Sequence, residues 1–340
     1  MLSSSARLLS DLDVEVQPDA PIGSMTWYGI GGRADLLVRP ASIDALATLV
    51  KRCRKSRTPL RVLGRGANLL VADEGVDGIV VRLDHPELAR FDYNPDGPVE
   101  RIRAMAGADL AKTIMDTARR GLRGLHHLAG IPASIGGAIR MNAGGKFGDV
   151  SDHVRSVTCI DPMGRIVVHD RASIDFAYRT SSLTEPVIVA AEFDLEPDDP
   201  IRVRDEIKEI FAFKSSTQPL ADHSAGCTFR NPVDPSTEQR VSAGKLIDAA
   251  GGKGLSEGEA EVSGRHANFI VTRGGATATD VLHLMERVQD RVFRHAGLRL
   301  EPELVVWRRG DPAGTLGATA DTRAETDSAT ERRHVLDLDD

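Results

Sequence analysis

A glycine-rich apolar segment in the middle of the chain limits the folds that are open to it. The segment HLAGIPASIGGAIRMNAG, residues 127–144, holds four glycines, one proline and a single Asp, Glu, Lys or Arg, which is Arg140. Its apolar content suggests a membrane span, but Gly130, Pro132 and the Gly136–Gly137 pair interrupt any continuous helix. We therefore expect main chain that lies close against another group, either a packed neighbouring element or a ligand.

The composition is that of an ordinary globular enzyme. The 340 residues are 41% hydrophobic and 27% charged, with a formal net charge of −7. This length can hold two or three domains. With no run of Lys and Arg, no leader pattern and no regular apolar run long enough to cross a bilayer, we expect a cytoplasmic protein that binds neither nucleic acid nor membrane.

The cysteine and histidine spacings give no sign of a metal centre. Cys53, Cys159 and Cys227 are far apart, and the ten histidines form no known ligand pattern. We expect no disulfide framework, no structural zinc and no catalytic metal, as suits a reducing compartment.

Short helix and strand patterns alternate along the chain. The spacing of apolar residues predicts helices near 42–55, 108–121, 205–214 and 279–297, and strands near 60–64, 78–83, 154–160, 165–169, 187–196 and 300–307. Residues 1–20 lack periodicity and are predicted to be an N-terminal extension. Residues 308–340 hold no aromatic residue and are rich in Ala, Thr and charged residues, so we expect a disordered tail.

A second segment with bare main chain, LGRGANLLV, follows a predicted strand at residues 63–71. Gly64 and Gly66 would let backbone N–H groups face a phosphate, although a plain tight turn is the alternative. The segment lacks the third glycine of the Rossmann fingerprint and the GK[ST] of a Walker loop. Two such segments in one region favour a large nucleotide cofactor.

Three motifs carry polar side chains that suit chemistry. They are YRTSSL with Arg179, SAGCTFRNP with Cys227, and LEPEL with Glu301 and Glu303, which would share one face of a strand. Each also has an ordinary interpretation: a solvated arginine, a small buried cysteine and a solvated sheet edge.

Taken together and in order, these stretches resemble the UDP-N-acetylenolpyruvoylglucosamine reductase family. The matching pieces are TWYGIGGRADLLVRP, LGRGANLLVADEGVDGIVV, LAGIPASIGGAIRMNAGGKFGDV, YRTSSL, SAGCTFRNP, SAGKLIDAAGGKG, HANFIVT and LEPEL, which span residues 26–306. No loop is inserted between Tyr178 and Glu192, so the chain resembles the short form of the family, without the tyrosine loop.

The resemblance implies an α+β fold. An FAD-binding domain of the vanillyl-alcohol oxidase and p-cresol methylhydroxylase type would cover residues 21–200, with two α/β subdomains at about 21–85 and 86–200. An α/β substrate-binding domain would cover residues 201–307. We also expect a monomer.

The resemblance further implies non-covalently bound FAD, with NADPH as the reductant. The FAD would lie on the two bare segments, on Gly64, Arg65, Gly66, Ala67, Asn68 and Leu69, and on Gly130, Ile131, Pro132, Ser134, Ile135, Gly136, Gly137 and Ala138, with Asn142 nearby.

The implied reaction reduces UDP-N-acetyl-enolpyruvoyl-glucosamine to UDP-N-acetylmuramate, a step of peptidoglycan precursor synthesis. Arg179 would stabilise the substrate carboxylate and the enolate, and Glu303 would polarise the substrate or hold Arg179. Cys227 stands where the family usually has a serine that protonates carbon. Because a thiol is mostly protonated at neutral pH, Cys227 is expected to serve as the acid, provided that Arg179 does not turn it into a thiolate.

Other residues in the matching motifs are candidates for contacts with the sugar nucleotide, although each could equally support loop structure. They are Tyr178, Arg230, Asn231, Lys245, His266 and Asn268. Two rival functions stay open: an FAD-dependent oxidase of the same fold, and a nucleotide-binding protein whose catalytic site has decayed.

Overall fold

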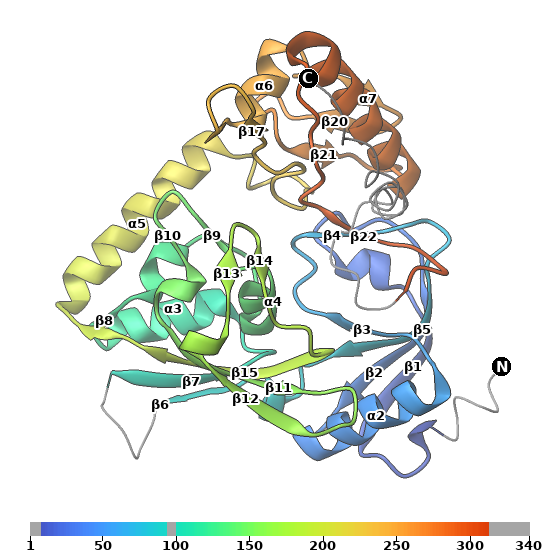
Figure 1. The fold of residues 1–340 in the computed structure, drawn as a ribbon, viewed down its shortest axis with the longest axis vertical. Helices are drawn as coiled ribbons and strands as arrows, with labels where there is room; N and C mark the ends of the chain where they lie inside the picture. Colours follow the sequence, from blue (N-terminus) through green and yellow to red (C-terminus); the bar gives the residue numbers. More distant parts are fainter. Residues whose placement is uncertain (1–7, 94–99, 313–340) are drawn as a thin grey trace, which may run out of the picture.

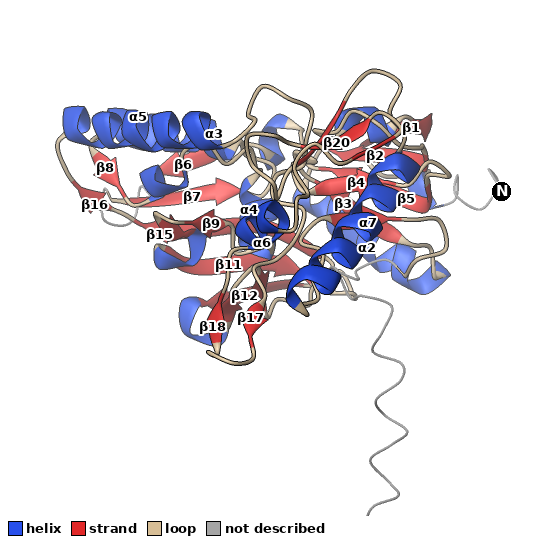
Figure 2. Cartoon of the chain, turned by 90° about the horizontal axis from the view of Figure 1, so that it is seen from above, coloured by secondary structure: helices blue, strands red, loops and turns tan. Residues whose placement is uncertain are grey.

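The computed structural model describes residues 8–93 and 100–312, which form three packed units (Figure 1). Each unit contains a sheet, and the third unit lies above the first in the view of Figure 1. Figure 2 shows the strands of the two larger sheets as separate groups. Within the described residues, no helix is long and apolar enough to span a membrane.

The first unit is a four-stranded sheet of order β1-β2-β5-β3, formed by Val14–Ala20, Ala34–Pro40, Val76–Arg82 and Leu60–Leu63. β1 pairs with β2 antiparallel, whereas β2, β5 and β3 are parallel. The predicted helix α2, Ile43–Ser56, is confirmed, and the Ser42 side chain caps it by accepting from Ala45 N. Its apolar face, with Leu46 and Leu49, is fully buried.

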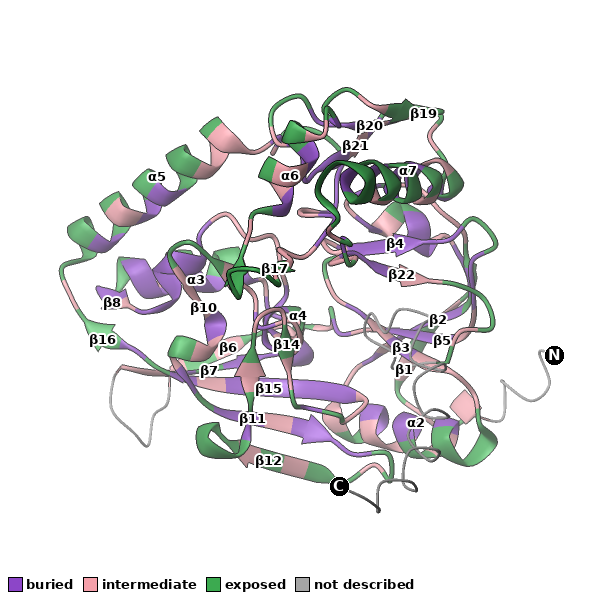
Figure 3. Cartoon of the chain, turned by 45° about the horizontal axis from the view of Figure 1, so that its top comes forward, coloured by how far each residue is buried: buried purple, intermediate pink, exposed green. Residues whose placement is uncertain are grey.

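The second unit is a five-stranded antiparallel sheet of order β12-β11-β15-β7-β6. Figure 3 shows β15 buried along most of its length, as expected of a central strand. The strands are Ile166–Asp170, Val154–Ile160, Val187–Asp194, Arg101–Met105 and Phe91–Tyr93, and the helices of this unit are α3 (Leu110–Arg119), α4 (Ile135–Arg140) and α5 (Pro200–Thr217). α4 packs on β15 and β7, and α3 packs on α5.

The third unit is a small three-stranded sheet, β19-β20-β21, with two helices. Its elements are β19 (Ser256–Glu257), β20 (Ala260–Val262), β21 (Ile270–Thr272), the hairpin β17 (Val233–Asp234) and β18 (Gln239–Arg240), α6 (Ala243–Ala249) and α7 (Ala278–Ala296). The helix predicted over 279–297 is confirmed as α7, with a capping box at Thr277 and a left-handed stop at Gly297. Tyr28 and Leu70 of the first unit join the core of the third.

Several short elements connect these units. They are β4 (Leu69–Val71), which pairs with β22 (Val305–Trp307); the pairs β8 (Leu122–Arg123) with β16 (Glu196–Pro197), β9 (Gly144–Gly145) with β10 (Gly148–Asp149), and β13 (Phe176–Ala177) with β14 (Thr180–Ser181); and the 3-10 turns η1 (Ile22–Met25), η2 (Pro86–Leu88), η3 (Leu125–Leu128), η4 (Val150–Asp152) and η5 (Arg171–Ser173).

The packing places two boundaries, the start of the first unit and the start of the third unit, at positions that differ from those expected from the sequence. Residues 14–20 are not an extension but the edge strand β1, because their main chain pairs with β2 although their side chains show no clean alternation. Val203, Ile207 and Ile210 of α5 enter the core of the second unit, so the third unit begins after Thr217 rather than at 201.

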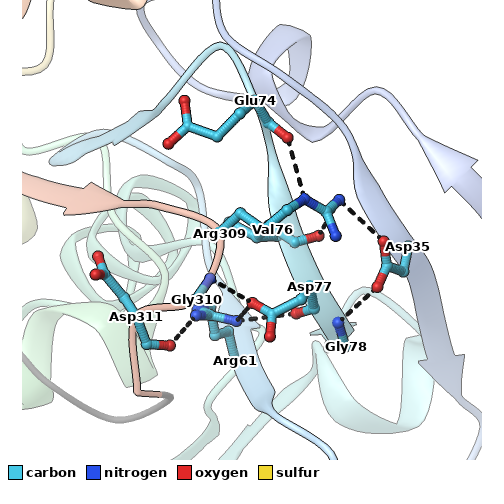
Figure 4. A network of polar contacts seen from close by, with 9 residues as sticks. All are labelled: Asp35, Arg61, Glu74, Val76, Asp77, Gly78, Arg309, Gly310 and Asp311. Atoms are coloured by element: carbon cyan, nitrogen blue, oxygen red, sulfur yellow. Dashed lines mark hydrogen bonds and ion pairs between the residues drawn. The ribbon is translucent and has the colours of Figure 1, made fainter.

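The start of the predicted disordered tail is ordered. Residues 308–312 cross back to the first sheet, where Arg309 Nη2 lies 3.0 Å from Asp35 Oδ1 and Arg61 Nη2 donates to Asp311 O at 2.6 Å (Figure 4). Gly310 N donates to Asp77 Oδ1 at 3.3 Å. We call residues 308–312 the C-terminal strap. The rest of the tail lies outside the described residues.

Candidate active site

A large cavity brings the two glycine-rich segments together with the three motifs that were predicted to carry chemistry. Its volume is about 770 Å³, which suits a cofactor or a substrate of nucleotide size. Arg179, Cys227 and Glu303 all line it, although they come from the second unit, the third unit and the segment that precedes β22.

Most of the predicted cofactor residues line this cavity. They are Gly64, Arg65, Gly66, Ala67, Asn68 and Leu69 of the first segment, and Gly130, Ile131, Pro132, Ser134, Gly136 and Gly137 of the second. Ile135, Ala138 and Asn142 are instead buried behind the wall, with at most 4% of their surface exposed. The side chains of Ile135 and Ala138 belong to the hydrophobic core beneath α4.

The two segments approach each other so closely that a side chain at the contact would not fit. A Cβ on Gly64 would lie 2.6 Å from Ser134 Oγ, and a Cβ on Gly136 would lie 2.8 Å from the Ala106 Cβ. Gly130 adopts the left-handed region, with φ of 79°. The bare main chain seen in the sequence therefore forms a closely packed part of the cavity wall, which we call the cradle.

Arg179 stands at the tip of the hairpin β13–β14 in a strained conformation. Its φ of 59° is left-handed, which an L-residue other than Gly, Asn or Asp seldom adopts. Its Nε donates to Glu303 Oε1 at 2.7 Å, and both side chains are largely buried, with 18% and 10% of their surface exposed. The ion pair thus joins two segments that are remote in sequence.

Burial and the ion pair act together on these two charges. Burial raises the pKa of Glu303 above its usual value, and Arg179 opposes this rise without cancelling it. Burial alone would lower the pKa of Arg179, but Glu303 raises it. Of the two predicted roles for Glu303, holding Arg179 is the one that the geometry supports.

Cys227 follows Gly226, which adopts a φ of 76°, at the cavity wall. Burial raises the pKa of the Cys227 thiol to about 12, and the carboxylate of Glu303 adds to this effect while Arg179 opposes it. Arg179 therefore does not produce a thiolate at neutral pH.

The six residues suggested for the sugar nucleotide lie elsewhere: none of them is among the described residues that line the cavity. The guanidinium groups of Arg179 and Arg240 lie over the ring of Tyr178, and the Tyr178 Oη accepts from Asn231 N. The Asn231 side chain accepts from Ala243 N, and the Lys245 side chain is exposed.

His266, Asn268 and Arg230 surround the loop that carries Cys227. The Asn268 amide bonds to both main-chain groups of Phe229, at 2.9 and 2.8 Å, and is committed to holding this loop. His266 packs edge-on against Phe269. Arg230 Nε is buried and has no hydrogen-bond partner among the described residues.

Lys214, which no motif in the sequence indicated, lines the cavity from the last turn of α5. Its Nζ donates to Ala129 O at 2.5 Å, and burial lowers its pKa to about 8, with Arg179 adding to the effect. The sequence gives little indication that Lys214 enters a cavity, because most lysines in the last turn of a helix are exposed to solvent.

One trio of described residues brings metal-ligand atoms together. Atoms of Cys159, His169 and Glu185 lie within 4.8 Å of one another. However, His169 Nε2 already hydrogen-bonds Glu185 Oε1 at 2.6 Å, and burial raises the pKa of Cys159 to about 12. The buried guanidinium of Arg140 interacts with both acidic groups and would repel a cation.

Comparison with known proteins gives one consistent result along the chain. A family model described as an FAD binding domain matches residues 34–170, and one for the C-terminal domain of UDP-N-acetylenolpyruvoylglucosamine reductase matches residues 218–307. The UDP-N-acetylenolpyruvoylglucosamine reductase of Heliobacterium modesticaldum is 42% identical over 306 residues, covering 89% of this chain and 94% of the relative. That of Moorella thermoacetica is 38% identical, covering 90% and 98%.

A solved structure of the same reductase, from Thermus caldophilus, superimposes with a TM-score of 0.72 at 35% identity, covering 87% of this chain and 100% of that one. The expected α+β fold, an FAD-binding domain followed by a second domain, is confirmed by these matches.

Proposed function

The chain belongs to the UDP-N-acetylenolpyruvoylglucosamine reductase family, and we propose that it reduces UDP-N-acetylenolpyruvoylglucosamine to UDP-N-acetylmuramate. It is an FAD-dependent oxidoreductase with NADPH as the reductant. The observation that carries the proposal is that the two cofactor segments, Arg179, Glu303 and Cys227 line a single cavity.

The main chain of the two glycine-rich segments would hold FAD, without a covalent bond. When bound, FAD supplies hydride transfer from NADPH to the enol-ether carbon of the substrate. The cavity of about 770 Å³ that both segments line has room for a dinucleotide, which their backbone N–H groups would hold. These residues bind and orient the cofactor and keep it still.

Arg179 would bind the substrate carboxylate and stabilise the enolate that develops on it. Its Nε is engaged by Glu303, whereas Nη1 and Nη2 make no hydrogen bond with any described residue. A guanidinium edge of this kind suits bidentate binding of a carboxylate. Because Glu303 fixes the orientation of the largely buried Arg179 side chain, Arg179 would need no rearrangement as negative charge develops.

Cys227 would deliver the proton to the carbon beside the one that takes hydride. The half-buried thiol stays protonated at neutral pH, so its proton is available when the carbanion forms. The thiolate left behind lies within the influence of Arg179, which stabilises it until solvent restores the proton.

Lys214, which reaches the cavity directly, would bind the nucleotide part of the substrate. Arg230 does not line the cavity, and its buried Nε has no hydrogen-bond partner among the described residues, so it would support the loop that carries Cys227. Tyr178, Asn231 and Asn268 would act by shaping the loops that carry Arg179 and Cys227. His266 packs in the same region, and the exposed Lys245 would act at the outer rim.

The two half-reactions test the proposal. NADPH should bleach the flavin absorbance of the purified holoprotein, and enolpyruvyl-UDP-GlcNAc, added without oxygen, should restore it in a stopped-flow instrument. Reduction without recovery on adding the substrate would refute the proposal. Flavin that stays in the pellet after denaturation would instead favour the rival oxidase, which often tethers FAD covalently.

We further propose that the protein is a cytoplasmic monomer that does not bind nucleic acid. A nucleotide sugar and NADPH are both used inside the cell, and a net charge of −7 disfavours binding to phosphate backbones. Light scattering coupled to size-exclusion chromatography tests the monomer, for which a mass near 36.6 kDa is expected.

A further inference from the structure

We propose that Asn68 and Asn142 are positioning residues that hold the Glu303–Arg179 ion pair and thereby couple the two cofactor segments to the chemistry. The inference rests on the function proposed above. It assigns both asparagines a task other than direct contact with FAD, which the sequence had suggested.

Asn142 anchors the hairpin that carries Arg179. It lies two residues after α4, is 4% exposed and adopts a left-handed φ of 42°. Its Nδ2 donates to Ala177 O at 3.1 Å, and its Oδ1 accepts from Ser151 N at 3.4 Å. Ala177 pairs with Thr180 across the tip of the hairpin, so this bond fixes the main chain just before Tyr178 and Arg179.

Asn68 anchors Glu303, the other residue of the ion pair. Its Nδ2 donates to the main-chain oxygen of Glu303 at 3.0 Å, while its own main-chain oxygen accepts from Val305 N at 3.2 Å. On the other side, Glu303 N donates to Thr228 O at 2.8 Å. The peptide of Glu303 is thus held between the first cofactor segment and the residue that follows Cys227.

The ion pair depends on Asn68 and Asn142 because the contact between the two charged side chains does not by itself fix the main chain that carries them. Arg179 sits in a left-handed conformation that persists only where neighbouring structure enforces it. Asn68 lies within the first cofactor segment. The second cofactor segment ends in α4, and Asn142 follows that helix. Ordering these segments around FAD therefore also orders the main chain beside both charged partners.

Two substitutions at position 142 separate the effect of the Asn142 side-chain hydrogen bonds from the effect of backbone strain. Asn142→Gly keeps the left-handed conformation and removes the side chain, whereas Asn142→Asp keeps the acceptor for Ser151 N but loses the donor to Ala177 O. Asn68→Asp likewise loses the donor to Glu303 O. Ser173→Ala is the matched control, because its hydroxyl also bonds only main chain, Asp170 O at 2.8 Å, on an exposed turn.

We expect the two Asn142 variants to bind FAD within about threefold of the wild-type affinity, measured by titrating apoprotein with FAD and following the flavin fluorescence. Flavin reduction by NADPH should be unchanged in these two variants. Asn68→Asp, which lies in the first cofactor segment, is compared in reoxidation alone. Reoxidation by the enolpyruvyl sugar nucleotide should slow by about 10- to 100-fold, since a small misplacement of an orienting group costs on this order. Ser173→Ala should match the wild type in all three measurements.

A double-mutant cycle distinguishes positioning from general loosening of the fold. If Asn142 acts through Arg179, then Asn142→Gly should change the reoxidation rate less than about twofold in an Arg179→Ala background. Equal losses in both backgrounds would overturn the proposal, and so would a loss of FAD affinity of more than tenfold as the main defect.

One measurement needs no substrate, so its outcome does not depend on the proposed function. Arg179 opposes the rise in the pKa of Cys227, so displacing Arg179 should slow alkylation of Cys227 by iodoacetamide at alkaline pH. Asn142→Gly and Arg179→Ala should slow it alike, as measured by peptide mass, and an unchanged rate in Asn142→Gly would overturn the inference. Wild-type protein that is not reoxidised by the sugar nucleotide would instead refute only the proposed function.

Discussion

Arg179 Nε lies 2.7 Å from Glu303 Oε1, although the two residues are 124 positions apart in the chain. One stands at the tip of a hairpin of the second unit, and the other precedes the strand that pairs with β4 of the first. The pair therefore forms only when these units have packed together, and both of its residues line the cavity.

Removing the carboxylate should damage both stability and turnover. In Glu303→Gln the largely buried Arg179 loses its partner, and breaking such a pair costs on the order of 3 kcal/mol. We expect a lower melting temperature and slower flavin reoxidation by substrate, with flavin reduction by NADPH retained. Glu303→Asp, which keeps the charge, should recover part of both. Equal melting temperatures for Gln variant and wild type would contradict the assigned ion pair.

The acid at position 227 should be replaceable only by another proton donor. Cys227→Ser should retain measurable turnover, whereas Cys227→Ala should be reduced by NADPH and then stall, because no group protonates the carbanionic carbon. Single-turnover measurements of the two half-reactions decide this. A fully active alanine variant would remove Cys227 from the mechanism.

Substrate binding should weaken as the pH rises through about 8. The pKa of Lys214, about 8, lies below the usual lysine value of 10.5 because burial disfavours its charge. Above that pH the ammonium loses its proton, and its attraction for the substrate diphosphate disappears. We expect KM for the sugar nucleotide to rise on the alkaline side, and Lys214→Arg, which stays charged, to flatten this rise.

The lowered pKa of Lys214 also affects how the free energy of unfolding depends on pH. Between about pH 8 and 10.5 the unfolded chain binds a proton at Lys214 that the folded chain has lost, so this group makes the free energy of unfolding increase with pH there. Chemical denaturation of wild type and Lys214→Met across this range measures the contribution. A steeper increase in the Met variant would contradict the sign.

The cradle should not tolerate a methyl group at Gly64. A Cβ there would lie 2.6 Å from Ser134 Oγ and push the two cofactor segments apart. We expect Gly64→Ala to weaken FAD binding by at least about tenfold, on the order of 1.4 kcal/mol. Gly264→Ala is the control, since its Cβ would meet no described atom within 4 Å. Fluorescence titration of apoprotein with FAD compares the two.

The C-terminal strap should slow the release of FAD. Asp311 and Pro312 line the cavity beside Arg61, and Arg309 holds the strap through Asp35, Glu74 O and Val76 O. Arg309→Ala should speed FAD dissociation several-fold, measured after dilution by the return of flavin fluorescence. Arg308→Ala is the matched control, because the Arg308 side chain makes no hydrogen bond or ion pair with any described residue. Equal rates in the two variants would refute this role.

Local patterns in the sequence were enough to place several elements. Ser42 and the apolar spacing after it predicted α2, and Gly297 marked the end of α7, because caps and helical periodicity depend on neighbours within a few residues. The two bare segments also indicated a nucleotide cofactor, since missing side chains are visible in a sequence.

Only the tertiary structure decided how these parts meet. Arg179 and Glu303 form a pair, α5 packs on the second unit, residues 14–20 join a sheet, and Asn68 and Asn142 bond main chain at remote positions. Lys214 enters the cavity for the same reason. Contacts between distant residues depend on how all the units pack together, and no pattern within a short window of sequence encodes that.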